Sequence, residues 1–464
     1  MYERLSVFDA SLLELERPET PLHAGGVSIF SPGLSFSDVH ETLRSRLHEV
    51  PRARCRVRSV RLGGRPIWDH DPDFDLSYHL RHGALPAPGN AAQLGDYLAR
   101  LIARPLDRSR PLWEVYLIEG VDGDKTALFR KVHLAMAGGE GGDPFAVLLD
   151  ADTDGSRTLV QGNWRPQRAP SDLHVAADAV RERMTHALQA GRELSALALR
   201  PTKAFKVATT AAGSAAGLAL RAVRSPPRSP LNRPLTPHRR FAVARAELDD
   251  LRRIRATFGG TINDSVVAVC ADAVGRLLRW RGHETKDLDL RVMVPVRVHA
   301  DGVDGELSAA ESLGEGAVGV LAPLPVMEMD PVARLYRIMG EMAGLKESRQ
   351  AVAADRLVTL AGYAPAQLHA IAARLATGEQ RYNLALSNAP GPQDRRCLAG
   401  VPLEASYPYI PLAGDAALSI AVTSYSGLLC FGLVGDRRAL PDLNYLASFI
   451  NDAIEALLDA AIAA

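Results

Sequence analysis

Apolar residues in the first third of the chain recur alternately at helical and at strand spacing. Residues 36–50 carry four aliphatic side chains on one stripe, which predicts an amphipathic helix capped by Ser37. Residues 91–107 repeat this pattern up to a proline, so a second helix is expected there. The apolar runs 112–121 and 126–136 are joined by the turn sequence DGDK, and they predict two paired strands.

The pattern changes in the middle of the chain and then returns. A helix is expected at 143–152, with Pro144 in its first turn. From Leu194 to Ala246 the chain has ten Lys or Arg and no acidic residue, and the stretch 225–240 is rich in proline. The second half again mixes both spacings. Its expected strands are 239–248, 290–298, 317–326, 382–392, 417–425 and 428–436, and its expected helices are 261–282 and 440–462.

This organisation predicts an α+β fold of two similar halves. The predicted division is an N-terminal domain at 1–160, a helical and Pro-rich basic crossing segment at 161–240, and a C-terminal domain at 241–464. A length of 464 residues also exceeds that of one ordinary hydrophobic core.

Composition narrows the function classes. The 54 basic and 54 acidic residues balance, so the total charge does not favour nucleic acid as a partner. The four cysteines are widely spaced and form no CxxC pair, which favours reduced thiols and predicts no metal site. The first 16 residues are too polar for a signal peptide, and no apolar run reaches 18 residues. A cytoplasmic protein without a resident cofactor is therefore expected.

The stretch RKVHLAMAGGEGGDPF at 130–145 carries the clearest candidate chemistry. His133 ends a predicted strand, and a glycine-rich loop interrupted by Glu140 follows it. This looks like the rim of an active site, but no neighbouring residue completes a catalytic pair with the histidine. Each residue also has a structural alternative. His133 would be a buried histidine bonded to the backbone, Glu140 would be a solvated loop residue, and Asp143 would cap a helix before the proline.

Nine sequence marks in order resemble the bacterial wax ester synthase/diacylglycerol acyltransferase family. They are LSVFDASLLELE, PLHAGGVSIF, DPDFDLSYHLRH, RPLWEVYLIEG, PLNRPLTPHRR, TINDSVVAV, VPVRV with SNAPGP, and LSIAVTSYSGLLCFGLVGD. The resemblance implies two chloramphenicol-acetyltransferase-like halves with a tunnel between them. It also implies acyl-CoA as the acyl donor and a long-chain alcohol or diacylglycerol as the acceptor.

The family's active-site motif, HHxxxDG, falls on the stretch that begins at His133. By this resemblance His133 matches the first, supporting histidine, and Leu134 stands where the second histidine acts as general base. Gly138 replaces the motif aspartate, and Gly139 matches the motif glycine. Loss of a general base costs about 10²–10⁴ in rate. Glu140 and Asp143 are the candidates for a substituted base.

The resemblance adds a second group of candidate residues that bind substrate. Asn263 and Asp264 carry the family's ND motif, and Ser387 and Asn388 begin SNAPGP. Their alternative roles are structural, because Asn and Asp cap helices and SNAPGP has the composition of a turn.

Three functions follow from the sequence. The first is an acyl-CoA-dependent O-acyltransferase of neutral-lipid synthesis whose catalysis is impaired or altered. The second is a non-catalytic protein that binds lipid or acyl-CoA, or that pairs with an active paralogue in a homo- or hetero-oligomer. The third is an enzyme repurposed for another acyl-transfer or condensation reaction. The basic helix expected at 203–224 either contacts an anionic lipid surface, of a membrane or a lipid droplet, or packs on the protein.

Overall fold

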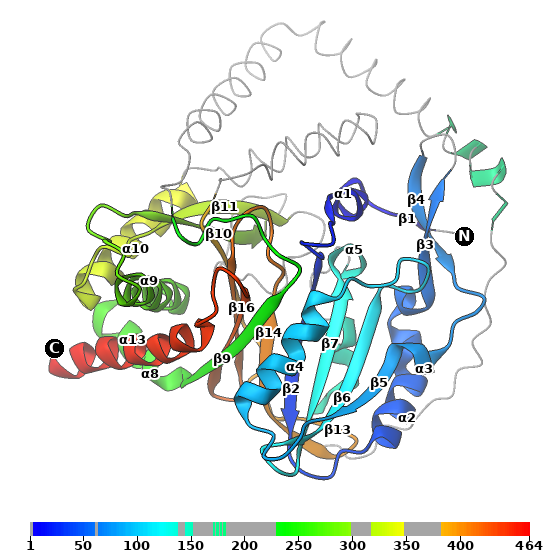
Figure 1. Ribbon diagram of the computed structural model, residues 1–464, viewed down its shortest axis with the longest axis horizontal. Coiled ribbons are helices and arrows are strands. Elements are labelled where there is room, and N and C mark those ends of the chain that lie inside the picture. Colours follow the sequence, from blue (N-terminus) through cyan, green and yellow to red (C-terminus); the bar gives the residue numbers. More distant parts are fainter. Residues whose placement is uncertain are drawn as a thin grey trace, which may run out of the picture.

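Two mixed β-sheets flanked by helices form the molecule, and they lie side by side in Figure 1. The computed structural model describes residues 3–60, 64–137, 144–151, 170–171, 173–175, 177–178, 180–181, 229–297, 317–347 and 382–464. The expected α+β architecture of two halves is confirmed.

The first sheet has seven strands in the order β5-β6-β7-β2-β14-β13-β8. These strands are β5 (Leu80–Ala84), β6 (Trp113–Val121), β7 (Lys125–His133), β2 (His23–Phe30), β14 (Val401–Tyr409), β13 (Arg396–Leu398) and β8 (Asp150–Ala151). A smaller sheet beside it has the order β1 (Glu3–Arg4), β4 (Gly64–His70) and β3 (Cys55–Val60). The helices of this half are α1 (Val7–Leu15), α2 (Phe36–Arg46), α3 (Leu76–His79), α4 (Ala91–Ala103) and α5 (Leu134–Ala137).

The second sheet has six strands in the order β11-β10-β12-β15-β16-β9. They are β11 (Ala317–Leu324), β10 (Leu290–Arg297), β12 (Leu384–Ala389), β15 (Leu418–Tyr425), β16 (Leu428–Asp436) and β9 (Arg239–Glu247). Its helices are α8 (Leu248–Phe258), α9 (Ile262–Trp280), α10 (Pro331–Glu347) and α13 (Leu443–Ala463). These helices bury the core of the second half against one face of the sheet.

The chain passes between the two sheets more than once. After β12 in the second sheet, β13 and β14 join the first sheet, where β14 pairs with β2, and the chain then returns to the second sheet as β15 and β16. Residues 396–409 thus belong to the first sheet although they lie late in the sequence. The division at 160 and 240 stays a prediction, and its crossing segment lies mostly outside the described residues.

Two local expectations were wrong: the residue that caps α2 and the helix expected at 143–152. In both places the hydrogen bonds that form differ from those that the local sequence suggested. Ser35, and not Ser37, caps α2: its side chain accepts from the Asp38 N–H at 3.2 Å, and Asp38 accepts from the Ser35 N–H at 3.0 Å. The expected helix at 143–152 is a 3₁₀ turn at Pro144–Leu148, followed by β8, which pairs with β13. The stripe of apolar residues predicted for α2 is buried, as expected.

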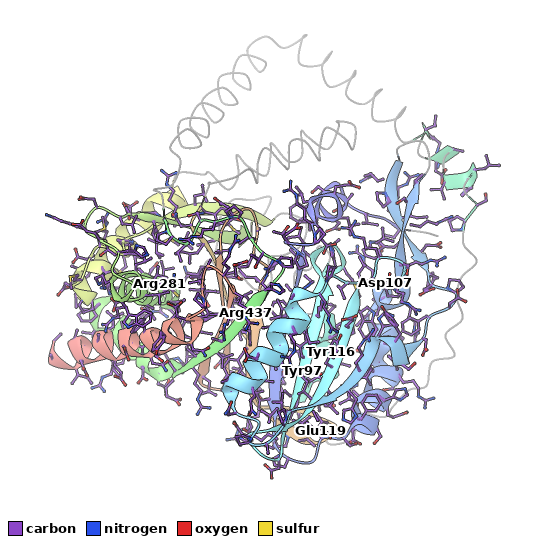
Figure 2. The ribbon with its side chains drawn as sticks, in the orientation of Figure 1. Tyr97, Asp107, Tyr116, Glu119, Arg281 and Arg437 are labelled. Carbon is purple, nitrogen blue, oxygen red and sulfur yellow. The ribbon has the colours of Figure 1, made fainter. Side chains whose placement is uncertain are left out.

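Helix α4 connects the two halves because it covers the first sheet and also packs on β9 of the second. A Cβ atom at Gly95 would lie 2.6 Å from the carbonyl oxygen of Phe241, so the helix and the strand approach as closely as glycine permits. On its other side Tyr97 fits over β5, where a Cβ at Gly83 would lie 2.2 Å from the tyrosine oxygen. Figure 2 labels Tyr97 on α4 and Tyr116 on the sheet beneath it.

The long helices of the second half are joined at their ends. Arg281, labelled in Figure 2, follows α9 and donates from Nε to Asp442, at the start of α13, at 2.8 Å. Most residues of α9 are buried. A helix held in this way gives the residues at its N-terminus a fixed position.

Candidate functional site

The end of β7 places His133 and Leu134 between two neighbouring segments. The His133 N–H donates to the Leu112 carbonyl at 3.0 Å, just before β6. The Leu134 N–H donates to the Leu22 carbonyl at 3.0 Å, just before β2. The strand ends at His133 and the chain turns into α5, which lies at the upper end of β7 in Figure 1. Both backbone positions are therefore fixed by the sheet.

The His133 side chain is fully buried and neutral. Its Nδ1 accepts a hydrogen bond from the Ala135 N–H at 3.0 Å, so the ring proton is on Nε2. Burial lowers the pKa of His133 to about 4, against the opposing attraction of Glu16. The hydrogen bond to the backbone that was expected for a buried His133 is thus present at Nδ1. Nε2 makes no hydrogen bond in the described part of the chain. The one free lone pair of the neutral ring is occupied by the backbone.

A carboxylate held by an arginine faces the other side of this ring. Glu16 Oε1 lies 3.7 Å from His133 Nε2 and accepts from the Leu22 N–H at 2.9 Å. Its Oε2 accepts from Arg108 Nη2 at 2.7 Å, and Arg108 also donates to the Leu13 carbonyl at 2.6 Å. Arg108 lies in the loop between α4 and β6 that Asp107 marks in Figure 2. Glu16 therefore keeps the Nε2–H side of His133 facing a negative charge.

Leu134 is buried in an apolar cluster separate from the three larger cores. The cluster consists of Leu12, Leu22 and Leu134, with Phe8, Leu15 and Ala24 packed around them. Helix α1 supplies three of these six side chains, and Leu134 is 9% exposed. The position that the sequence resemblance assigns to the base is thus filled by hydrocarbon.

A second buried polar network lies on the face of the first sheet that α4 covers. His23, directly opposite His133 in the β2–β7 pair, contacts the Tyr409 hydroxyl at 3.1 Å and the Arg104 carbonyl at 3.2 Å. Burial lowers the pKa of His23 well below its ordinary value. Lys131 donates to carbonyls at the end of α4, and burial lowers its pKa to about 8. These bonds anchor the end of α4, from which the loop carrying Arg108 begins.

In the second half, the start of α9 lies against the end of β12. Thr261 and Asp264 form a capping box, in which the Asp264 N–H donates to Thr261 Oγ1 at 3.2 Å and Asp264 Oδ2 accepts from the Thr261 N–H at 2.8 Å. Asn263 Oδ1 accepts from Asn388 Nδ2 at 3.1 Å. Ser387 is buried beside Asn388 on the strand. The capping role expected for Asp264 is confirmed, and Asn263 has a separate partner.

The sequence-predicted residues therefore form two groups on two sheets. His133 and Leu134 are together at the end of β7, while Asn263, Asn388 and their neighbours lie at the α9–β12 contact. Gly138, Gly139, Glu140 and Asp143 lie outside the described residues, as do residues 203–224. Trp113 of the PLW mark is core: its ring is buried and its Nε1 donates to the Ala53 carbonyl at 2.7 Å.

Sequence spacing did not single out Glu16, Arg108 or His23. Glu16 and Arg108 are 92 positions apart, so no local pattern joins them. The available signal was the position of Glu16 and His23 inside two quoted marks, LSVFDASLLELE and PLHAGGVSIF, without a role for either residue.

The described residues contain neither a metal site nor a membrane-spanning helix. No group of three or more His, Cys, Asp or Glu side chains there could hold a metal ion. Within the same ranges, no helix combines the length and the apolar character needed to cross a membrane.

Known proteins resemble this chain along nearly its whole length. Residues 5–266 match the sequence model of the wax ester synthase/diacylglycerol acyltransferase catalytic domain, and residues 314–458 match that of the C-terminal domain. A putative diacylglycerol O-acyltransferase of Mycobacterium tuberculosis is 30% identical over 474 residues, covering 98% of this chain and 90% of the relative.

Solved structures share the fold. The wax ester synthase/diacylglycerol acyltransferase from Marinobacter aquaeolei VT8 aligns with a TM-score of 0.68 and 26% identity, covering 99% of both chains. A starter condensation domain of rhizomide synthetase, a mutant in complex with C8-CoA, aligns with a TM-score of 0.54 and 13% identity, covering 99% of this chain and 95% of that one. The second likeness concerns the fold alone.

Proposed function

The chain belongs to the wax ester synthase/diacylglycerol acyltransferase family, and we propose that it binds acyl-CoA but forms esters far more slowly than a member with an intact base. The acyl acceptors to be tested are a long-chain alcohol and diacylglycerol, the substrates of the activity for which the family is named. The proposal concerns the rate of the chemical step, because the two-half fold itself is retained.

The observation that carries this proposal is the surroundings of Leu134. Transfer to a hydroxyl requires a group that takes the hydroxyl proton, and a leucine packed among Leu12 and Leu22 has no atom that can do so. The adjacent His133 offers no substitute in this arrangement. Its Nδ1 lone pair is bonded to the Ala135 N–H, and its Nε2 carries the proton.

The expected loss follows from the size of general-base catalysis. A positioned base contributes about 10²–10⁴ in rate, equivalent to roughly 3–5 kcal/mol of transition-state stabilisation. Binding and orientation of the two substrates do not need the base, so they would leave a slow residual reaction.

The test compares binding and turnover in one preparation of the full chain. Palmitoyl-CoA binding is measured by titration calorimetry, and free CoA is measured with a thiol reagent after hexadecanol or dioleoylglycerol is added. We expect saturable binding with CoA release at least about 10² slower than that of a family member carrying both motif histidines, assayed in parallel. Release at a comparable rate would show that another group acts as the base.

Glu140 and Asp143 remain the candidates for such a substituted base. If either serves, Glu140→Ala or Asp143→Ala abolishes the CoA release that the wild-type chain shows. If both variants keep the wild-type rate, neither carboxylate is the base.

A second candidate function is a binding protein without turnover, and the buried apolar cluster around Leu134 favours it. Such a protein would carry an acyl lipid, assist lipid-droplet assembly or pair with an active paralogue. It would bind palmitoyl-CoA and release no CoA above the rate of spontaneous hydrolysis. A third function, another acyl-transfer or condensation reaction, predicts CoA release with an acceptor other than an alcohol or diacylglycerol.

A further inference from the structure

In the side-chain amide of Asn263, the oxygen makes a hydrogen bond and the nitrogen makes none in the described structure. Its Oδ1 accepts from Asn388 Nδ2 at 3.1 Å, which fixes the plane of the amide. Its Nδ2 is buried and makes no hydrogen bond in the structure as described, and the residue is 8% exposed. A buried N–H donor without an acceptor is rare in folded proteins, so this donor requires an explanation.

Capping of α9 does not explain it. Thr261 and Asp264 already form the complete capping box at this helix end. A structural amide elsewhere in the same half shows the contrast. Asn383 is fully buried, and it both donates to Asn232 Oδ1 at 2.7 Å and accepts from the Arg291 N–H at 2.7 Å. The amide of Asn383 is used on both sides, whereas that of Asn263 is used on one.

The surroundings of the unused donor define the ligand chemistry. An N–H donor at a helix N-terminus binds an oxygen acceptor, and the helix dipole favours partial negative charge there. The carboxylate of Asp264 is the next residue on the same helix turn, so a fully charged anion such as a phosphate would be repelled. A neutral, polarised carbonyl oxygen satisfies both conditions.

We propose that Asn263 Nδ2 donates a hydrogen bond to the carbonyl oxygen of a bound acyl group. Asn388 is the positioning residue that fixes the direction of this donor. The carbonyl belongs either to the thioester of an acyl-CoA or to an ester of a glycerolipid. This inference rests on the proposed binding of acyl-CoA and gives that binding a specific polar contact in the second half.

The test uses a pair of ligands that differ only in the carbonyl. Palmitoyl-CoA and S-hexadecyl-CoA have the same chain length, but the thioether has no carbonyl oxygen. Calorimetric titrations of the full chain compare wild type with Asn263→Ala and Asn388→Ala. Asn451→Ala, an exposed asparagine of α13, is the matched control. A third ligand, dioleoylglycerol in mixed micelles, provides the ester carbonyl.

We expect Asn263→Ala to weaken palmitoyl-CoA about tenfold and to leave S-hexadecyl-CoA unchanged. Asn388→Ala should weaken palmitoyl-CoA less, and Asn451→Ala should weaken neither ligand. If the selective loss appears with dioleoylglycerol and not with palmitoyl-CoA, the carbonyl is that of the glycerolipid.

Three results distinguish failure of the inference from failure of its premise. An equal loss for both CoA ligands, or no loss for any ligand, overturns the role of Asn263 while acyl-CoA binding stands. If wild type binds neither CoA ligand nor dioleoylglycerol, the proposed function fails first. Thermal unfolding of each variant verifies that the chain is folded in every titration.

Discussion

The end of β7 in the first half and the start of α9 in the second carry the two groups of motif residues, and they differ in what they retain. At β7 the position that the family resemblance assigns to the base is Leu134, which packs with Leu12 and Leu22. At α9 the polar pair Asn263 and Asn388 is intact, and one amide donor remains unused. The first place has an apolar side chain at the assigned base position, whereas the second has polar side chains with a hydrogen-bond donor to spare.

This difference shows why fold and reaction must be judged separately. Hydrocarbon can replace an imidazole at Leu134 because α1 covers it, and the strand hydrogen bonds around it do not depend on the side chain. The fold therefore accommodates a leucine at this position, although a leucine cannot take up a proton. At the start of α9 the capping box of Thr261 and Asp264 fixes the helix end independently of Asn263.

The largest effect on stability is expected at His133, where the first half still buries a titratable ring. Its pKa is about 4 in the folded chain, against an ordinary value near 6.5. Between these values the unfolded chain binds the proton and the folded chain does not, so stability falls as the pH drops from about 6.5 to 4. His133→Gln keeps an acceptor for the Ala135 N–H but cannot titrate. Between pH 7 and 4.5 we expect the free energy of unfolding of this variant to fall by about 2–3 kcal/mol less than that of wild type.

Urea unfolding at the two pH values measures this difference. His48→Gln is the control. His48 is exposed, so this variant should keep the acid sensitivity of wild type. Equal acid sensitivity in wild type and His133→Gln would show that His133 is solvated or already charged near neutral pH.

A somewhat smaller effect is expected from opening the apolar cluster. Leu134→Ala should lower the free energy of unfolding by about 2 kcal/mol, because the methyl groups lost are buried against Leu12 and Leu22. Leu12→Ala should cost a similar amount, and the double variant should cost less than the sum because both remove the same contact. Strict additivity in denaturant unfolding would indicate that the two side chains do not touch.

The smallest effect is expected at the start of α9. Thr261→Ala removes the side chain that accepts from the Asp264 N–H and should lower the free energy of unfolding by about 1 kcal/mol. Asn90→Ala, in the matching capping box of α4, is the control from the first half. If Thr261→Ala instead costs several times more than Asn90→Ala, the start of α9 is held by more than its cap.

The sequence allowed the fold to be predicted, because the fold follows from the order of motifs along the chain. The assignment of the base position to Leu134 stays a prediction. Helices α2 and α9 followed from apolar spacing. The cap of α2 was misplaced from Ser35 to Ser37, since either serine fits the pattern and only the bond with Asp38 decides.

Contacts between segments that are distant in the sequence could not be predicted from local patterns of residues. The bond from Arg108 to Glu16 and the packing of Leu134 on α1 arise only when the loop after α4 and the first helix meet at the end of β7. The placement of β14 beside β2 likewise depends on a crossing between the sheets. These contacts show that His133 has its Nδ1 bonded to the backbone and that Leu134 is covered.

Restoration of the base tests the central claim most directly. CoA release from palmitoyl-CoA with hexadecanol is compared among wild type, Leu134→His with Gly138→Asp, and Leu134→Met, which keeps the position apolar. If the missing base limits the reaction, the double variant should gain about 10² or more in rate while Leu134→Met stays at the wild-type rate. A wild-type rate that already equals that of the folded double variant would contradict the claim that Leu134 blocks the chemistry.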